Sequence, residues 1–271
     1  MLRKSLLCQS GLSIVELMVG VVVGLIVVSG VVAIYGVIAR SSAEILGSAK
    51  LNEELRAAMD MMVGDIRRAG VWVPSSIDER SKTTNPYTDR DKTPMTDINI
   101  SAGGKCIEFA YDASYLGAGA TPDNNNDFYG YKYTSTSDGK AIAARFKRSV
   151  DSTCTTDAIG DDWRRLTDEK NIEILNLSFS TEGSRCFNAS KPVSNLSPFN
   201  PWFSGSPYLL PACDPTNSAY NASSGDRLIE SRQIIVVLSG SIKSNIQAMK
   251  DFKMELGQRV RVANDRVITA Q

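Results

Sequence analysis

Near its start the 271-residue chain has one long apolar run. It covers residues 17–39, 23 positions without a charge, with Glu16 directly before it and Arg40 directly after it. At about 1.5 Å of rise per residue, a helix of this length spans a hydrocarbon core of about 30 Å. The pattern therefore predicts one membrane-spanning helix.

The helical pattern continues beyond the apolar run. Over residues 41–69, apolar side chains recur mostly at steps of three or four, and most charged side chains lie on other faces. The apolar positions are Ile45, Leu51, Leu55, Met59, Met62 and Ile66. Gly70 and Pro74 are expected to end the helix. The prediction is one continuous helix of about 55 residues, apolar all round in its first half and amphipathic in its second.

The remainder of the chain is predicted to be rich in β-strands. Short runs with alternating polarity are separated by connections rich in Gly, Asn, Pro and Ser. The expected strands are 98–100, 106–111, 128–133, 141–146, 172–179, 234–239 and a final strand within 254–264. An antiparallel sheet that is polar on one face would bury its other face against the amphipathic helix. The predicted fold class is α+β, with a long N-terminal helix packed on an antiparallel sheet head with long loops.

The residues before the apolar run have the features of a processing site. Residues 11–16 read G-L-S-I-V-E. An ionised carboxylate at the start of a bilayer-length helix is costly unless it is paired, so Glu16 is a candidate functional residue. No A-x-A pattern follows the apolar run, whereas Gly11 and the apolar Leu12 precede it. Cleavage between them would leave the whole apolar helix on the mature chain.

These residues resemble the class III signal peptide of type IV pilins and type II secretion pseudopilins. The resemblance implies that a prepilin peptidase cleaves after Gly11, that Leu12 becomes the N-methylated first residue, and that Glu16 is the fifth mature residue. Major pilins usually carry Phe at the first position, so Leu12 favours a minor pilin. In a filament, Glu16 would neutralise the amine of Leu12 on a neighbour. Small residues, among them the G-x-x-x-G of Gly20 and Gly24, would allow helices to pack closely.

A second pair of motifs extends the resemblance. Residues 53–60 read E-E-L-R-A-A-M-D and residues 64–70 read G-D-I-R-R-A-G, which look like the PilW-type minor pilins and the J-type pseudopilins. The simpler interpretation of Arg67 and Arg68 is that cations at a helix C-terminus meet the helix dipole. The resemblance implies a structural subunit that helps to initiate or cap a type IV pilus, used in adhesion, twitching motility or DNA uptake. The alternatives are a J-type minor pseudopilin of a type II secretion system and a membrane-anchored adhesin.

The resemblance also implies a domain order, a location and a set of partners. Residues 1–11 would be the prepilin leader, 12–39 the transmembrane and polymerisation helix, 40–73 the amphipathic half of the helix, and 74–271 the periplasmic or extracellular head. The basic residues Arg3 and Lys4 predict a cytoplasmic N-terminus. The protein is expected in the inner membrane and then in the pilus at the cell surface. Its expected partners are other minor and major pilins, the prepilin peptidase, the inner-membrane assembly platform and the membrane.

The cysteines are consistent with export. Cys8 would leave with the leader, and Cys106, Cys154, Cys186 and Cys213 would remain as an even set in an oxidising compartment. Four cysteines allow three pairings, and we favour the sequential one because its second bridge would staple a proline-rich loop. With no C-x-x-C spacing and no His in the chain, a metal site is not expected.

The sequence predicts no enzyme and no cofactor. The absence of His removes the commonest general base and every Ser-His or Cys-His pair. The acidic clusters are 161–162 and the stretch from Asp123 to Asp127. The latter has the oxygen-rich composition of a calcium loop but lacks the Gly at position six and the distal Glu of an EF-hand, so a solvated turn is favoured.

Charge and aromatic content give little support for a nucleic-acid partner. The chain has 30 basic and 30 acidic residues, so it has no overall field that attracts DNA. Two short basic patches, 145–148 and 163–165, are expected to be solvated, and direct nucleic-acid binding is not predicted. The proline-rich loop has aromatic side chains that either pin the loop to the sheet or form a partner surface. They are Phe199, Trp202, Phe203, Tyr208 and Tyr220.

Overall fold

The chain divides into two compact units, Met1–Ala49 and Lys50–Gln271. The computed structural model describes residues 13–73, 85–90, 95–101, 103–113, 122, 126–135, 137, 139–146, 154, 162–190, 213, 222–243 and 252–270. The boundary between the units falls inside the segment 40–73 that the sequence predicts to be amphipathic helix. The predicted leader, residues 1–11, lies outside the described residues.

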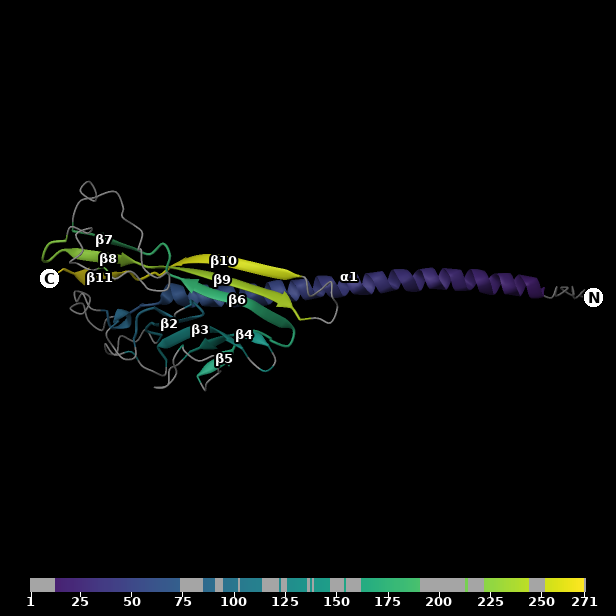
Figure 1. Cartoon of the computed structure of the whole chain (residues 1–271), viewed down its shortest axis with the longest axis horizontal. Coiled ribbons are helices and arrows are strands. Elements are labelled where there is room, and N and C mark those ends of the chain that lie inside the picture. Colours follow the sequence, from purple (N-terminus) through teal and green to yellow (C-terminus); the bar gives the residue numbers. More distant parts are fainter. Residues whose placement is uncertain are drawn as a thin grey trace, which may run out of the picture. The chain divides into compact units, whose positions relative to one another are not determined.

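One helix runs through both units, and it confirms the prediction of a single long helix. The helix α1 covers Ile14–Arg68, 55 residues (Figure 1). Its N-terminus is capped by Ser13, whose Oγ accepts from the main-chain N–H of Val15 at 3.4 Å. At the other end, Gly70 has a φ of +73°, the left-handed conformation that commonly follows a helix and suits glycine.

Burial of the helix begins at Leu51. The buried residues of α1 share one face of its second half, and they are Leu51, Leu55, Ala58, Met59, Met62, Val63, Asp65 and Ile66. Five of the six apolar positions that the sequence predicts for this face are among them. The prediction for Ile45 is wrong, because that side chain is 64% exposed and belongs to the first unit.

Within the described residues, antiparallel strands form three sheets, which confirms the α+β class. The first has the order β1-β2-β3-β4-β5, made of Asn99–Ile100, Cys106–Ala110, Phe128–Ser135, Lys140–Arg145 and Trp163–Arg165. The second has the order β10-β9-β6, made of Lys253–Arg261, Gln233–Ile242 and Ile172–Ser180. The third has the order β11-β8-β7, made of Arg266–Thr269, Arg227–Ser231 and Arg185–Asn188. A short 3-10 helix, η1, covers Pro86–Thr88.

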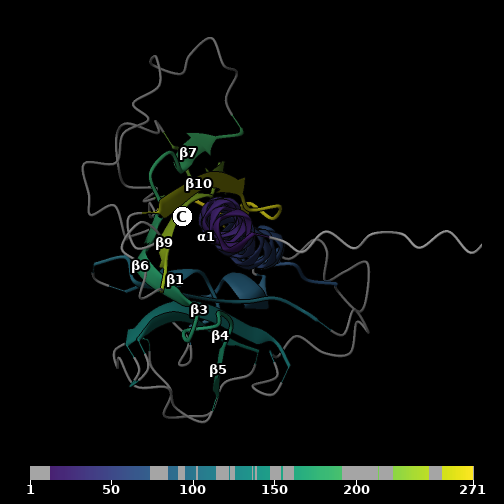
Figure 2. The ribbon, with the colours of Figure 1, turned by 90° about the vertical axis from the view of Figure 1, so that its right-hand side faces the viewer.

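The main core lies where the second half of α1 meets the first two sheets. Figure 2 shows these sheets on two different sides of the helix. Apolar side chains from the helix and from both sheets form one continuous cluster. The helix approaches β9 so closely that a Cβ at Gly240 would lie 3.2 Å from Leu55 Cδ2. The two sheets are joined beside β6, where the N–H of Phe179 donates to the carbonyl of Gly104 at 2.8 Å.

The third sheet was not expected from the sequence. Each of the seven predicted segments overlaps an observed strand, but the segment 254–264 is not the last one, because β11 follows β10. The strands β5, β7, β8 and β11 were also not predicted. Figure 1 shows β7, β8 and β11 together beyond the C-terminal end of α1.

Candidate functional site

The first half of α1 presents an apolar surface. Its large apolar side chains are exposed, from 54% at Val21 and Val23 to 79% at Ile14. Among the described residues, α1 is the one helix long and apolar enough to cross a membrane. Glu16 is its acidic residue in the first turn, where the helix dipole favours a negative charge.

The small residues of this half of α1 have open space around them. A Cβ added at Gly20, Gly24, Gly30 or Gly36 would meet nothing within 4 Å. Glycine inside a helix costs about 0.5 to 1 kcal/mol relative to alanine, and no contact among the described residues requires it at these positions. The predicted cleavage pair, Gly11 and Leu12, lies outside the described residues.

The end of the helix is held by main-chain contacts with distant segments. The carbonyl of Arg67 accepts from the N–H of Ala263 at 2.9 Å, and the N–H of Gly70 donates to the carbonyl of Ala110 at 2.8 Å. The carbonyl of Gly70 accepts from Asn85 Nδ2 at 2.7 Å. The G-D-I-R-R-A-G motif therefore joins the helix to three parts of the head.

Asp65 and Arg68 of the same motif organise a group of tyrosines. Buried Asp65 accepts hydrogen bonds from the hydroxyls of Tyr131 and, at 3.4 Å, Tyr111, and it pairs with Arg68. The guanidinium of Arg68 lies 4.9 Å from the ring centre of Tyr111, which stacks on Tyr129 at 4.1 Å. Burial, with the charge of Asp65 in support, raises the pKa of the Tyr131 phenol. Arg68 thus contributes a specific ion pair and a cation–π contact in addition to any interaction with the helix dipole.

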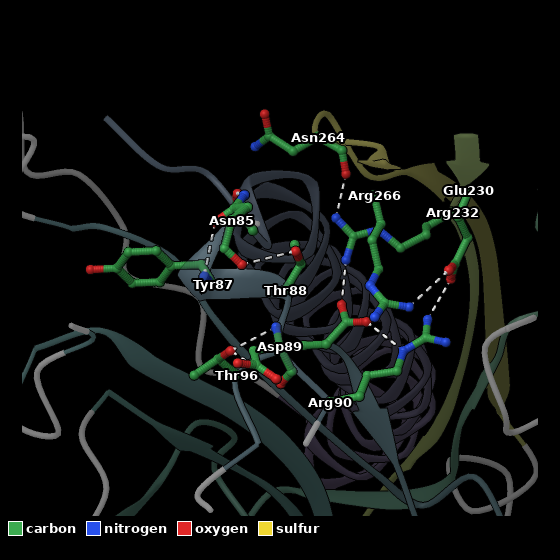
Figure 3. Close-up of polar contacts among 12 residues, drawn as sticks. Asn85, Tyr87, Thr88, Asp89, Arg90, Thr96, Glu230, Arg232, Asn264 and Arg266 are labelled. Carbon is green, nitrogen blue, oxygen red and sulfur yellow. Dashed lines mark hydrogen bonds and ion pairs between the residues drawn. The ribbon is translucent and has the colours of Figure 1, made fainter. Parts of the chain in front are cut away.

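A buried group of charges lies beside the helix end. Arg232 is fully buried; it donates to Asp97 and to the main-chain carbonyl of Asn264. Arg90 donates to Asp97 at 2.8 Å and also to Glu230. Figure 3 shows Arg232 reaching the carbonyl of Asn264 and Arg90 reaching Glu230.

This group, which we call the arginine network, also includes Arg266, whose Nη1 lies 3.7 Å from Glu230 Oε2. Burial raises the pKa of Glu230, and the positive charges of Arg90 and Arg232 oppose that rise. The network ties the segment before β1 to the β8–β9 and β10–β11 connections. The network has a structural role: buried charges are stable only when they are paired, so these ion pairs hold the three segments together.

The outer face of the first sheet is polar, as the sequence predicts, but its polar side chains Glu108, Lys132 and Arg145 are buried. Arg145, expected in a solvated basic patch, is fully buried and pairs with Glu108. Two cations lie near the ring of Trp163 on β5, with Lys132 Nζ 4.6 Å and Arg145 Cζ 5.0 Å from the ring centre. A Cβ at Gly130 would lie 3.1 Å from this ring, so glycine makes room for it. The prediction of a solvated patch is wrong for Arg145 because an ion pair and an aromatic ring replace the water.

The cysteines form the sequential pairs that the sequence favours. Cys106 is joined to Cys154 with a Cα–Cα distance of 5.8 Å, and Cys186 to Cys213 with 5.6 Å. The first bridge contacts Trp163 on the covered face of the first sheet. The second anchors residue 213 to β7.

The other candidate residues show no arrangement for catalysis or metal binding in the described part of the chain. Asp127 accepts from the Tyr87 hydroxyl at 2.9 Å and from the Ala113 N–H at 3.2 Å. No group of three or more possible metal ligands occurs among the described residues. Residues 123–125, Asp161, and the loop aromatics lie outside them; the aromatics are Phe199, Trp202, Phe203, Tyr208 and Tyr220.

Sequence reasoning did not find the arginine network. Its members come from segments far apart in the sequence, and the hydrogen bond from Arg90 to Glu230 spans 140 positions. The sequence contains one signal of the network: Arg232 is a charged residue at the junction of two segments that form strands. A lone charge at such a place also fits an exposed turn, so the sequence did not distinguish the two.

A long helix with an exposed apolar first half, packed in its second half on antiparallel sheets, defines the class of type IV pilin-like proteins, which includes the pseudopilins. More specifically, the chain belongs to the family of prepilin peptidase-dependent protein B, whose family model matches residues 44–262. The match covers the second half of α1 and most of the head, and it begins after the predicted processing site. No curated protein and no solved structure matches the chain.

Proposed function

We propose that this protein is a PilW-type minor pilin, a structural subunit that helps to initiate or cap a type IV pilus. The observation that carries this proposal is the first half of α1, an exposed apolar helix that begins with one carboxylate. Membership of a prepilin peptidase-dependent family supports it. In this proposal the protein has no enzymatic activity and needs no cofactor.

The proposed route begins in the inner membrane with the N-terminus in the cytoplasm and the head in the periplasm. The prepilin peptidase cuts between Gly11 and Leu12, and Leu12 is N-methylated. In the assembled filament Glu16 pairs with the amine of Leu12 on a neighbouring subunit, because a carboxylate in apolar surroundings needs an opposite charge. The glycines with open space around them allow neighbouring helices to approach.

The processing step is tested by the intact mass of the protein from its native cells, with and without the prepilin peptidase. A mature chain that starts at methylated Leu12 only when the peptidase is present supports the proposal. A chain that keeps residues 1–11 in both strains contradicts it.

The assembly step is tested with Glu16→Gln, and the matched control is Glu44→Gln at an exposed position of the same helix. We expect Glu16→Gln to insert into the membrane normally and to fall at least about tenfold in sheared filaments, because an unpaired amine remains. Normal recovery of Glu16→Gln would contradict the proposed pairing. Recovery with secretion-system subunits instead of pilins would identify a J-type pseudopilin.

A further inference from the structure

The strand β10 forms one edge of the second sheet. It pairs with β9 over 9 consecutive residues without a register shift, whereas the pairing of β6 with β9 on the other side contains one. Strands are typically about five or six residues long, and proteins commonly interrupt a long sheet edge with a proline or a bulge. Neither feature occurs in β10. The second sheet therefore has a long and regular edge.

The main-chain groups of alternate residues in β10 point away from β9. Just after β10, the N–H of Val262 donates to the carbonyl of Arg232 at 3.0 Å, so the even-numbered residues of this register bond to β9. The next N–H, of Ala263, points the other way and donates to the carbonyl of Arg67. By the same alternation, the N–H and C=O groups of five residues of β10 face the edge. These residues are Lys253, Glu255, Gly257, Arg259 and Arg261.

This edge is open to solvent. All five of these residues are exposed, and because Gly257 has no side chain, its exposed surface is main chain. In the part of the chain that the structure describes, their outward N–H and C=O groups have no hydrogen-bond partner. A Cβ added at Gly257 would meet nothing within 4 Å, so no contact among the described residues requires glycine there. Glycine inside a strand often marks the close approach of another backbone.

The spacing of these groups determines what can cover them. Successive outward residues lie about 6.8 Å apart, and each presents one donor and one acceptor. An extended backbone matches that repeat, which is how a strand from another chain joins a sheet edge. Neither Lys253 nor Arg259 forms an ion pair within the described residues, whereas Arg261 pairs with Asp265 at 3.1 Å. A strand with carboxylates opposite the two unpaired cations is therefore favoured.

A second copy of this chain fits the edge less well than a different subunit. At one end of β10, Gly240 lies opposite Met254 and beside Leu55 of α1. At the other end, Ala263 bonds to Arg67, so β10 runs in the same direction as the buried half of α1. Antiparallel pairing of two β10 strands would therefore make the two helices run in opposite directions. Anchoring of both copies in one membrane does not allow this.

We propose that the edge of β10 binds an extended segment of another subunit of the same assembly. This segment adds a strand to the second sheet and places carboxylates opposite Lys253 and Arg259. The charged side chains of β10 discourage unspecific pairing, while Gly257 leaves the main chain accessible at the centre of the edge. The identity of the partner as a subunit rests on the proposed function, whereas the open edge follows from register and exposure alone.

The openness of the edge is tested by residue-resolved amide hydrogen exchange on the full chain in detergent micelles. We expect the outward amides of β10 to exchange at least about tenfold faster than the inward amides, which bond to β9. The amide of Ala263 is the control, because its bond to Arg67 should keep it slow. Equal protection of the outward and inward amides would overturn the inference.

The partner is tested with the photoreactive residue p-benzoylphenylalanine in place of Glu255, in the full chain in its native cells. The matched control places it at Leu175 of β6, which is 36% exposed. We expect a discrete adduct from position 255, absent from position 175, that mass spectrometry identifies as another prepilin-type subunit. Gly257→Pro should reduce this adduct at least about tenfold, because proline lacks the N–H and its ring blocks the incoming backbone. Gly257→Ala keeps the N–H and should retain the adduct.

Proline at an outward position leaves the bonds to β9 intact, so Gly257→Pro should fold. If it does not accumulate, Arg259→Pro is compared with Arg259→Ala in the same way. In either case the outward amides of the parent should become protected when it is co-purified with the partner that the adduct identifies. The inference is overturned by no adduct, by an adduct to a second copy of this chain or to a protein outside the assembly, or by equal adducts from the proline and alanine variants. Leader removal and the Glu16→Gln result are read separately, so failure of this edge is distinguishable from failure of the proposed function.

Discussion

Both halves of α1 are α-helix, but the apolar side chains of the first half are exposed and those of the second half are buried. In the first half, Leu25 is 64% exposed and belongs to a surface that is apolar all round. In the second half, Leu55 is fully buried in the core of the head. The second half is thus stabilised by its own chain, whereas the first half has an apolar surface that only a membrane or other subunits can cover. The same residue type therefore has a folding role in one half and, under the proposed function, an assembly role in the other.

The largest expected effect on stability comes from the arginine network beside the C-terminal end of α1. Arg232→Ala removes a fully buried guanidinium and leaves Asp97 without one of its two cations. Breaking a buried pair costs about 3 to 5 kcal/mol, so we expect a loss of that order in the free energy of unfolding. Urea unfolding of the full chain in detergent micelles, followed by near-UV circular dichroism, measures it.

The control is Arg261→Ala, whose side chain is 72% exposed and pairs with Asp265 at 3.1 Å. Exposed pairs contribute at most about 1 kcal/mol, so this variant should unfold almost like the parent. Equal losses in the two variants would show that burial of the arginine network does not matter to the head.

Next in size is the direct comparison of two leucines. Leu55→Ala creates a cavity between α1 and β9 and should cost about 2 to 5 kcal/mol in the same urea experiment. Leu25→Ala removes an exposed side chain and should leave the unfolding of the head unchanged. In sheared filaments the order should reverse, with Leu25→Ala reducing incorporation through lost helix packing. A loss of head stability in Leu25→Ala would remove the distinction between the two halves.

Two glycines, Gly64 inside the second half of α1 and Gly70 just after its end, should give effects of opposite sign on stability. Gly70→Ala must adopt a left-handed backbone and brings a Cβ within 2.9 Å of the Arg232 guanidinium, so we expect a loss of about 1 to 2 kcal/mol or more. Gly64 lies inside the helix with nothing within 4 Å of an added Cβ. Gly64→Ala should therefore stabilise the head by about 0.5 to 1 kcal/mol. Thermal unfolding of both variants measures these changes in stability. A lower stability of Gly64→Ala would mean that the glycine has a contact in the folded head.

The smallest expected effect is a change of stability with pH. It concerns Asp168, which contacts Lys50 near the start of the buried half of α1. Hydrogen bonds from Asn171, from Lys50 at 3.1 Å and from the Lys170 N–H lower the pKa of Asp168 below its ordinary value of 3.8. A carboxyl with a lowered folded pKa contributes stability above its ordinary pKa and loses it as the pH falls through the folded value.

The stability difference between the parent and Asp168→Asn should therefore be constant above pH 3.8 and shrink below it. Urea midpoints measured from pH 7 to pH 2 test this, with Asp60→Asn on the exposed face of α1 as the control. A stability difference that is unchanged at pH 2 would contradict the lowered pKa of Asp168 as its cause.

The sequence predicted those features that depend on local periodicity. The length of α1 and its buried stripe follow from apolar spacing, as do strands such as β6 and β9, in which apolar side chains alternate or run together. The strands β8 and β11 were missed because Arg227, Glu230 and Arg266 interrupt the apolar pattern. A charged residue fits into a strand only where another part of the chain supplies a partner or where its face of the strand is exposed. Pairing of this kind depends on tertiary structure and leaves no periodic signal.

The candidate site was predictable to the same degree. Exposure of the apolar helix around Glu16 follows from the composition of residues 17–39, and Gly11 and Leu12 remain predictions outside the described residues. Arg145 shows the limit of sequence reasoning, since its burial depends on Glu108 and Trp163 from other strands. The contacts of Asp65 and Arg68 were also beyond sequence reasoning, because the tyrosines come from β3 and from the position directly after β2.

The contact between Arg67 and Ala263 also has a consequence for the order of folding. The end of α1 is made early in synthesis, but the N–H of Ala263, which donates to the carbonyl of Arg67, is made late, as is the carbonyl of Asn264 that accepts from Arg232. Closing such long loops is slow, since the entropy of loop closure is lost before the contacts form. Until the chain has grown past residue 264, Arg232 lacks one acceptor and the helix end lacks its cover. We therefore expect the end of α1 to reach its final environment only after residues 263 and 264 have been made.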